Sequence, residues 1–254
     1  MPREELLSPE GLRLDGRRWN NLRTLKLSLR THPTSSGSAL LTSGHTSILC
    51  LIHGPSEPSL RSKQQHDRCT ITVDLTYAPF SGTDRKRRNR TDKRISELRS
   101  VIQRTFSRAV MTHLHPRSEI TITLLVLSQD GGVLAGCINA ATLALIDAGV
   151  PMWGYVAAVT VGWVPGQGGE GEEEGTPVLD VNNAEEGELG VLTLATMGDK
   201  GRVILGMLES RVRLEAVEGL MAVAVDSAGK VKDMMDEEVR RHGEAIARAA
   251  GVGS

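Results

Sequence analysis

The sequence predicts an α+β fold in which mixed sheets pack against helices. Several short runs alternate polar and apolar residues, as half-buried strands do, and longer segments repeat apolar residues at three and four, as amphipathic helices do. These elements follow the order strands, helix, strand, helix, then strands and helix again, which differs from a Rossmann alternation. We therefore expect a single domain over residues 1–254, built of two similar lobes at about 21–152 and 153–250.

Four strands are predicted in the first part of the chain. Residues 23–30 (RTLKLSLR) alternate polar and apolar side chains. The segment SALLTSGHTSILCLIHGP is typical of two strands joined at Ser43 and Gly44, a hairpin signal. Residues 69–77 (CTITVDLTY) alternate again. Because these strands follow one another closely, we expect them to form an antiparallel meander.

Two helices and a buried strand are predicted next. The charged run at residues 84–94 (DRKRRNRTDKR) leads into a helix at about 92–113. Residues 119–127 (EITITLLVL) form a strand apolar enough to be buried on both faces. Residues 128–150 (SQDGGVLAGCINAATLALIDAGV) then indicate a strand end, a glycine pair and a helix that stops before Pro151.

The second lobe begins with a strand at residues 156–164 (VAAVTVGWV) and a returning strand at 177–181. The low-complexity acidic loop 165–176 separates them. GVLTLAT and RVILGML predict a second hairpin across MGDKG. A long helical region follows from about Leu214 to Ala250, and we expect a break or bend near Gly229.

Composition narrows the class of protein. Only seven residues are aromatic, so the core must be mostly aliphatic, and 30 basic against 31 acidic residues give no whole-chain attraction for nucleic acid. The three cysteines form no C-x-x-C pair and fit a reducing compartment. The N-terminus lacks the apolar run of a signal peptide, and no stretch of 18 apolar residues occurs. We therefore expect an intracellular, soluble protein without membrane association.

The glycine pair is the first candidate site. Backbone N–H groups of Gly131 and Gly132, with the positive end of a helix dipole behind them, can bind an anion. Val133 and Leu134 stand where a cationic side chain would help. A purely structural strand-to-helix turn explains the same glycines.

A group of acids follows the returning strand of the second lobe. Asp180 ends that strand, and Glu185 and Glu186 lie five and six residues later. Two such carboxylates can hold Mg²⁺ beside a phosphodiester, although solvated loop acids explain them equally simply. His113 and His115 have no third ligand near them in the sequence, so a zinc site is not predicted.

Basic residues suggest contact with a phosphate backbone. Arg61, Lys63 and Arg68 form one basic loop, and Lys93 and Arg94 stand where the charged run becomes a helix. Two basic loops at one end of a sheet can line a groove for single-stranded nucleic acid. A solvated surface or a nuclear localisation signal explains the run at 85–94 as well.

Three segments, in the same order, resemble motifs of the ribonuclease PH family. They are SPEGLRLDGRRWNNLR, LSQDGGVLAGCINAATLALIDAGVPM and VLDVNNAEE. The resemblance spans about residues 8–245 and is greatest to ring subunits of the eukaryotic RNA exosome that are related to the catalytic archaeal ring subunit. It implies a ribonuclease PH-like fold, of the ribosomal protein S5 domain 2-like type.

Active members of this family shorten RNA from its 3′ end with inorganic phosphate as nucleophile, and their glycine turn continues Gly-Thr-Arg. Here Gly132 is followed by Val133 and Leu134. The family also uses two aspartates six residues apart; Asp180 matches the first, but Glu186 takes the place of the second. An added methylene misplaces a ligand of Mg²⁺, which demands near-octahedral geometry. The resemblance thus implies a degenerate site without catalytic residues, metal or cofactor.

The resemblance further implies a non-catalytic ring subunit. Lys93 and Arg94 would line a central pore for single-stranded RNA, with the loop of Arg61 and Lys63 nearby. Expected partners are other ribonuclease PH-like chains in heterodimers and a hexameric ring, S1/KH cap subunits and a hydrolytic exoribonuclease. Expected locations are the nucleus, nucleolus and cytoplasm.

Two alternatives remain open at this point. One is an active phosphate-dependent 3′–5′ exoribonuclease, which would use Asp180 and Glu186 and bind phosphate through backbone groups alone. The other is a free-standing RNA-binding protein of the same fold.

Overall fold

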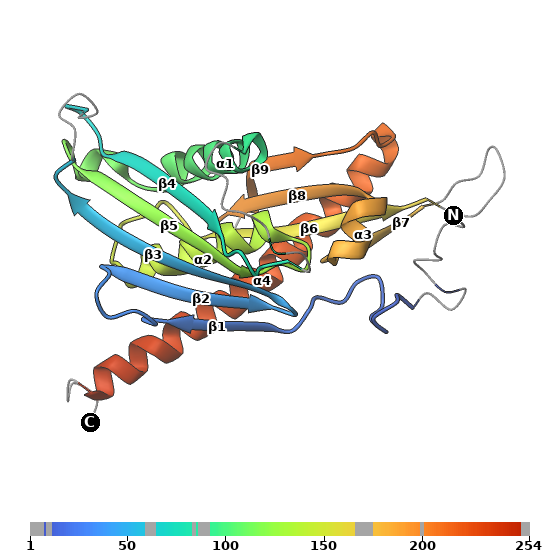
Figure 1. The fold of residues 1–254 in the computed structure, drawn as a ribbon, viewed down its shortest axis with the longest axis horizontal. Helices are drawn as coiled ribbons and strands as arrows, with labels where there is room; N and C mark the ends of the chain where they lie inside the picture. The colour runs from blue at the N-terminus through green and yellow to red at the C-terminus, as the bar shows by residue number, and fades with distance from the viewer. Residues whose placement is uncertain are drawn as a thin grey trace.

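The structure is a computed structural model that describes residues 8, 12–58, 65–82, 85, 92–165, 175–198 and 201–249. Two sheets and several helices confirm the α+β class (Figure 1). The first sheet has five strands in the order β1-β2-β3-β5-β4. Their bounds are β1 Leu25–Leu29, β2 Gly37–Ser43, β3 Thr46–Ser56, β4 Thr70–Tyr77 and β5 Glu119–Ser128.

The second sheet has four strands in the order β7-β6-β8-β9. Their bounds are β6 Val156–Val164, β7 Thr176–Leu179, β8 Gly190–Met197 and β9 Arg202–Leu208. Every pairing in it is antiparallel, so mixed pairing occurs in the first sheet and not in the second. The predicted hairpin of β8 and β9 is confirmed.

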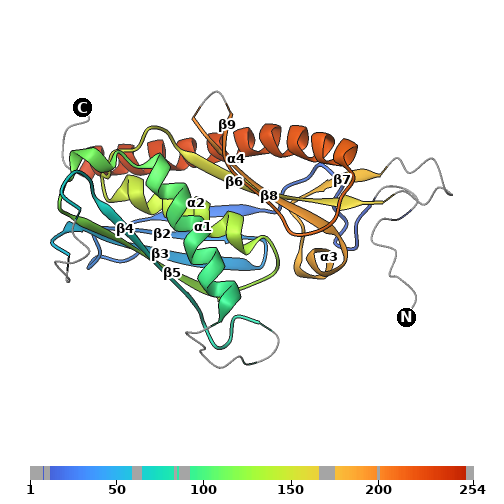
Figure 2. The ribbon, with the colours of Figure 1, turned by 90° about the horizontal axis from the view of Figure 1, so that it is seen from above.

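Helix α2, Val133–Asp147, lies between the two sheets and contacts β2 and β3 on one side and β6 on the other (Figure 2). Residues 134–145 are buried on every side of this helix. That pattern is typical of a helix that is apolar all round and lies in a core. The aliphatic core predicted from composition is therefore built around α2.

Two further long helices pack against the sheets. Helix α1, Lys93–Ala109, packs along β4, and α4, Leu214–Ala249, covers β6 and β8 (Figure 2). A 3-10 turn, η2, spans Thr112–Leu114, and a short helix, α3, spans Asn183–Glu188. None of the described helices is both long and apolar enough to cross a membrane.

Two predictions about the first sheet are wrong. The expected meander does not form, because β5 lies between β3 and β4, and β4 pairs with β5 in parallel. The link through α1 supplies the crossover that parallel strands need. Strand β5 is also not buried on both faces: its burial alternates, since the face opposite the core is only half-buried.

In the second half, one prediction needs correction and one element was not predicted. Helix α4 is continuous through Gly229, where a break or bend was expected. A Cβ at Gly229 would meet nothing within 4 Å, so this exposed glycine reflects neither close packing nor a left-handed turn. Helix α3 was missed, because its six residues, NAEEGE, carry no apolar periodicity.

Candidate functional site

The glycine turn joins β5 to α2 and packs against the loop that follows β7. Gly131 and Gly132 have φ values of 75° and 62°, in the left-handed region that favours glycine. A Cβ on Gly131 would lie 2.5 Å from the backbone carbon of Asn182 and 2.6 Å from the oxygen of Val181. The turn therefore has a structural need for glycine, whatever it binds.

A carboxylate of the chain itself occupies the N-terminus of α2. The backbone N–H of Gly132, the N-cap residue, donates a hydrogen bond of 3.1 Å to Oε2 of Glu186. A helix N-terminus favours negative charge, because its N–H groups are unpaired and its dipole is positive there. Glu186 thus sits at the position that was considered, from the sequence, as a candidate site for an external anion.

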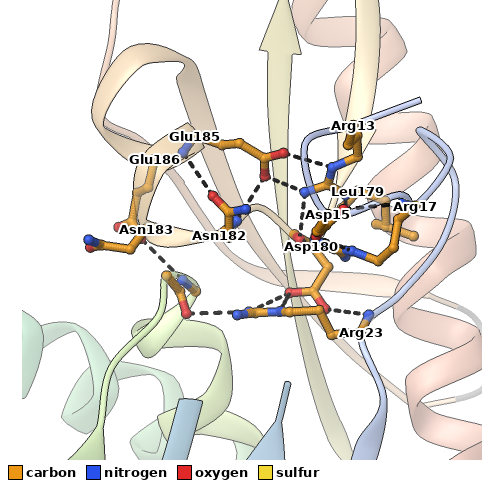
Figure 3. A network of polar contacts seen from close by, with 12 residues as sticks. Arg13, Asp15, Arg17, Arg23, Leu179, Asp180, Asn182, Asn183, Glu185 and Glu186 are labelled. Carbon is orange, nitrogen blue, oxygen red and sulfur yellow. Dashed lines mark hydrogen bonds and ion pairs between the residues drawn. The ribbon is translucent and has the colours of Figure 1, made fainter. Parts of the chain in front are cut away.

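Helix α3 holds Glu186 in that position. Asn182 is its N-cap and forms a capping box with Glu185, whose backbone N–H donates to the Asn182 side chain at 3.0 Å. The Glu185 carboxylate in return accepts from the backbone N–H of Asn182 at 2.9 Å. Figure 3 shows Glu185 and Glu186 leaving α3 in different directions, with Glu185 toward Arg13.

Asp180, which matches the first of the two family aspartates, is held by Arg23. It has a φ of 54° just after β7. The Arg23 Nη2 and Nε groups donate to Asp180 Oδ1 at 2.6 and 3.0 Å, and the Arg23 backbone N–H donates to Oδ2 at 2.9 Å (Figure 3). Arg23 also donates to the carbonyl oxygens of Asp130 and Gly131. It therefore binds the segment that starts at Asp180 to the glycine turn.

A second arginine pairs with the other acid in a buried position. Arg13 Nε donates to Glu185 Oε1 at 2.8 Å, Arg13 Nη2 bonds Glu185 Oε2, and the side chains are 0% and 2% exposed. The same guanidinium donates to the carbonyls of Leu179 and Asp180. The Nε, Nη1 and Nη2 groups of Arg13 therefore all donate hydrogen bonds, as a buried charge requires.

Arg17 is the third arginine of the N-terminal segment that binds this region. We call Arg13, Arg17 and Arg23 together the arginine clamp. It donates to Asp15 Oδ2 at 2.7 Å and to the carbonyl of Asp180 at 3.1 Å. Partial burial of Asp15 acts to raise its pKa, but the hydrogen bonds and charge of Arg17 outweigh this and leave the pKa below its ordinary value. Figure 3 shows the three arginines converging on the segment around Asp180.

These contacts do not form a Mg²⁺ site. The Asp180 carboxylate is taken by Arg23 and the Glu186 carboxylate accepts from Gly132, so the two acids serve different partners. Glu186 lines the larger pocket beside the turn, whereas Asp180 lines a smaller one next to Arg23. In the part of the chain that the structure describes, no cluster of three or more His, Cys, Asp or Glu is placed to hold a metal ion.

The larger pocket lies between α1, the glycine turn and α3, with a volume of about 550 Å³. Leu134, 8% exposed, stands at the turn and offers an aliphatic surface. Arg99 lines the pocket but is bound to Asp74 at 3.1 Å and to the Leu75 carbonyl at 2.7 Å. Arg94 also lines the pocket, and its side chain is 71% exposed. Among the described basic residues that line the pocket, it has the weaker pairing, with Glu209 at 3.8 Å.

The basic residues expected to contact RNA are not all at one end of the sheet. Arg61 and Lys63 lie outside the described residues. Arg68 precedes β4, whereas Lys93 and Arg94 begin α1, which runs back along the same strand. Eight residues of strand span about 25 Å, so Arg68 lies at the other end of β4 from Lys93 and Arg94. Lys93 and Arg94 do remain exposed together.

The residues that position this site were only partly foreseen. Arg13 and Arg17 belong to a motif that the sequence singled out, but nothing in it indicated their partners. Arg23 was assigned to the strand predicted at residues 23–30, whose polar and apolar residues alternate, and nothing in that pattern indicated its partner. The signal available for Glu185 is its place three residues after Asn182, the spacing of a capping box.

Comparisons with known proteins give consistent results. A family model described as 3′ exoribonuclease family, domain 1 (RNase PH) matches residues 21–151. The exosome complex component SKI6 of Saccharomyces cerevisiae is 37% identical over 246 residues, which cover 96% of each chain. The exosome complex component ski6 of Schizosaccharomyces pombe is 40% identical over 237 residues, 93% of this chain and 94% of the other.

A mammalian relative and a solved structure extend these findings. The exosome complex component RRP41 of Homo sapiens is 36% identical over 240 residues, 94% of each chain. The crystal structure of rice (Oryza sativa) Rrp46 superposes with a TM-score of 0.75 at 22% identity, over 90% of this chain and 100% of that one. At that identity the structure supports the fold alone.

Proposed function

This chain belongs to the 3′ exoribonuclease family, and we propose that it is a non-catalytic ring subunit of an RNA exosome. In this role it helps to form the channel that leads single-stranded RNA to a separate 3′–5′ ribonuclease. Support comes from relatives described as exosome complex components, which are 36%, 37% and 40% identical over nearly the whole chain. Its ribonuclease PH-like fold, expected from the sequence motifs, agrees with the family match.

The hydrogen bond from Gly132 to Glu186 is the observation that carries the non-catalytic part of the proposal. An attacking phosphate would have to displace a carboxylate of the same sign from the N-terminus of α2. Leu134 supplies no charge to compensate for this repulsion. A charge-assisted hydrogen bond contributes about 1.5–3 kcal/mol, and loss of one transition-state donor costs roughly 10²–10³ in rate.

Asp180 supports the same proposal, because its carboxylate is already bound by Arg23. Its two carboxylate oxygens accept three hydrogen bonds from Arg23, within a pair whose side chains are 7% and 13% exposed. Binding a divalent cation there would place a second positive charge against a guanidinium. Mg²⁺ prefers oxygen ligands that are free to form an octahedron, and this pair does not provide them.

The RNA-guiding role is proposed for two exposed basic residues at the start of α1, of which Arg94 also lines the pocket. Lys93 and Arg94 begin α1 and are solvent-exposed. Backbone contacts of this kind need cations and no base readout. We propose other ribonuclease PH-like subunits in heterodimers and a hexameric ring, S1/KH cap subunits and a hydrolytic exoribonuclease as protein partners.

A phosphorolysis assay tests the proposal. The purified chain is incubated with 5′-labelled single-stranded RNA, Mg²⁺ and inorganic phosphate, and nucleoside diphosphates are measured. We expect no phosphate-dependent shortening. The triple variant Val133→Thr, Leu134→Arg, Glu186→Asp, which rebuilds the residue types of active members, serves as the comparison. Diphosphate release by the unaltered chain would refute the proposed absence of catalysis.

An active phosphate-dependent exoribonuclease is the second candidate. The observation in its favour is that Arg94 lines the same pocket as the glycine turn and is only loosely paired, at 3.8 Å from Glu209. In that case Arg94→Ala would abolish diphosphate release that the unaltered chain shows. The same assay therefore separates the two candidates.

A further inference from the structure

Strand β9 forms an outer edge of the second sheet, with β8 as its neighbour in that sheet. Figure 1 shows β9 as the upper rim of the sheet, beside α1. Residues 203–208 (VILGML) carry no charge and none of them is buried, whereas residues 191–196 of β8 are all buried. Val203 is 42% exposed and Leu208 39%. Proteins usually protect such an edge with Lys or Pro, and this segment has neither.

The ladder shows which backbone groups of β9 face outward. The N–H of Glu209, just after the strand, donates to the Val191 carbonyl at 3.2 Å. Residues of an antiparallel strand alternate between facing the partner and facing away. With the observed register, Met207 therefore bonds to β8, and the N–H and C=O groups of Gly206 and Leu208 point to the outer edge. The pairing of β8 and β9 also contains a β-bulge, which lies earlier in β9, opposite Ala195 and Thr196.

We propose that β9 pairs with an extended strand of a neighbouring ring subunit, which continues the second sheet across the subunit boundary. This rests on the proposed function, because it takes the neighbour to be another ribonuclease PH-like chain. A strand fits this edge because it offers alternating donors and acceptors at the same spacing as Gly206 and Leu208. A helix has satisfied its own backbone groups, and a nucleic acid would find no cation along residues 203–208.

Hydrogen–deuterium exchange gives the first test. The tagged full-length chain is purified from its source cells in complex with its partners, which are identified by mass spectrometry, and is compared with the isolated chain. Amides in a peptide that covers residues 202–208 should exchange at least tenfold more slowly in the complex. Equal exchange in the two samples would show that no strand pairs there.

Gly206→Lys gives the second test. A Cβ at Gly206 meets nothing within 4 Å, so the lysine fits the isolated chain and places its charge at the outer edge. We expect at least a tenfold loss of co-purified ribonuclease PH-like chains, with unchanged thermal unfolding of the isolated variant. Gly229→Lys, on the exposed side of α4 and equally uncrowded, is the matched control and should retain its partners.

The outcomes separate this inference from the proposed function. If the chain assembles but Gly206→Lys keeps its partners and β9 exchanges freely, the edge pairing is wrong and the ring role stands. If the unaltered chain co-purifies with no ribonuclease PH-like chain, the proposed function itself is wrong. If β9 is protected only in a homodimer of this chain, the assignment to a neighbouring ring subunit is wrong.

Discussion

Arginines from the N-terminal segment hold residues 180–185, which include two acids of the site, in place. Arg13 pairs with Glu185, and Arg23 pairs with Asp180, although these partners lie more than 150 residues apart in the chain. Both pairs are also bonded to backbone groups, so their charges are compensated where water is excluded. At the scale of single residues, the former candidate ligands are therefore parts of a structural clamp.

Removal of one member of the buried pair should cost stability. In Glu185→Ala, Arg13 keeps a buried charge without its carboxylate, and the capping box of α3 is lost too. We expect a loss of about 3–5 kcal/mol in the free energy of unfolding. Urea denaturation measures it, with Glu188→Ala, an exposed position on the same helix, as the control that should change little.

At the scale of elements, the glycine turn connects β5 and α2 and touches the segment before α3. Its positive φ values and its contact with the Asn182 backbone are required for packing. At the N-terminus of α2, the N–H of Gly132 donates to Glu186. The turn thus serves to join three elements, and this packing alone requires its glycines.

Gly131→Ala should destabilise the protein more than Gly149→Ala does. Both glycines have a positive φ, 75° and 69°, but a Cβ at Gly149 meets nothing within 4 Å. The left-handed conformation costs roughly 1–2 kcal/mol for alanine, and overpacking adds about 1–3 kcal/mol at Gly131 alone. Equal losses of stability in urea denaturation would show that the turn is not tightly packed against Asn182.

The N-terminus of α1 is the element assigned to RNA. In the assembled complex, Lys93→Glu with Arg94→Glu should weaken the binding of single-stranded RNA at least tenfold, because two phosphate contacts become repulsive. Assembly should remain intact, since both side chains are exposed. Fluorescence anisotropy and native mass measurement report the two properties. Collapse of the assembly would instead make these residues part of a subunit interface.

At the scale of the whole molecule, two sheets enclose α2 and share one core. The cysteines belong to this core: Cys50, Cys69 and Cys137 are free and buried. Burial raises the pKa of Cys137 to about 12 and that of Cys50 well above its ordinary value. The thiols therefore stay protonated in the folded state at pH values where an unfolded chain begins to ionise them.

Alkaline pH should weaken the fold through these thiols. Because the folded pKa of Cys137 is raised, its contribution is fully present below the unfolded value of about 8.5 and is lost as pH rises toward 12. In that window Cys137 lowers the free energy of unfolding by up to roughly 1.4 kcal/mol per pH unit. Urea denaturation at pH 8 and 10.5 should show a steeper decline for the unaltered chain than for Cys137→Ala; parallel declines would contradict this.

The sequence allowed the strands, the main helices and the family to be predicted, because alternation, helical periodicity and three motifs are local signals. The strand order could not be predicted, because nothing in residues 70–77 shows that β5 will lie between β3 and β4. The clamp was missed for a similar reason: Arg23 and Asp180 are far apart in sequence and meet only when both sheets pack. The turn was recognised, but its partner Glu186 was considered only as a metal ligand, a loop acid or a degenerate position, and not as a group that bonds the turn.

The Gly132 amide gives the most direct test of the claim that the chain fills its own anion site. Its NMR signal is followed while inorganic phosphate is added to the full chain in the presence of Mg²⁺. We predict no saturable shift for the unaltered chain and a saturable shift for Glu186→Ala, which frees the N–H. A saturable shift of Gly132 in the unaltered chain at submillimolar phosphate would contradict the account.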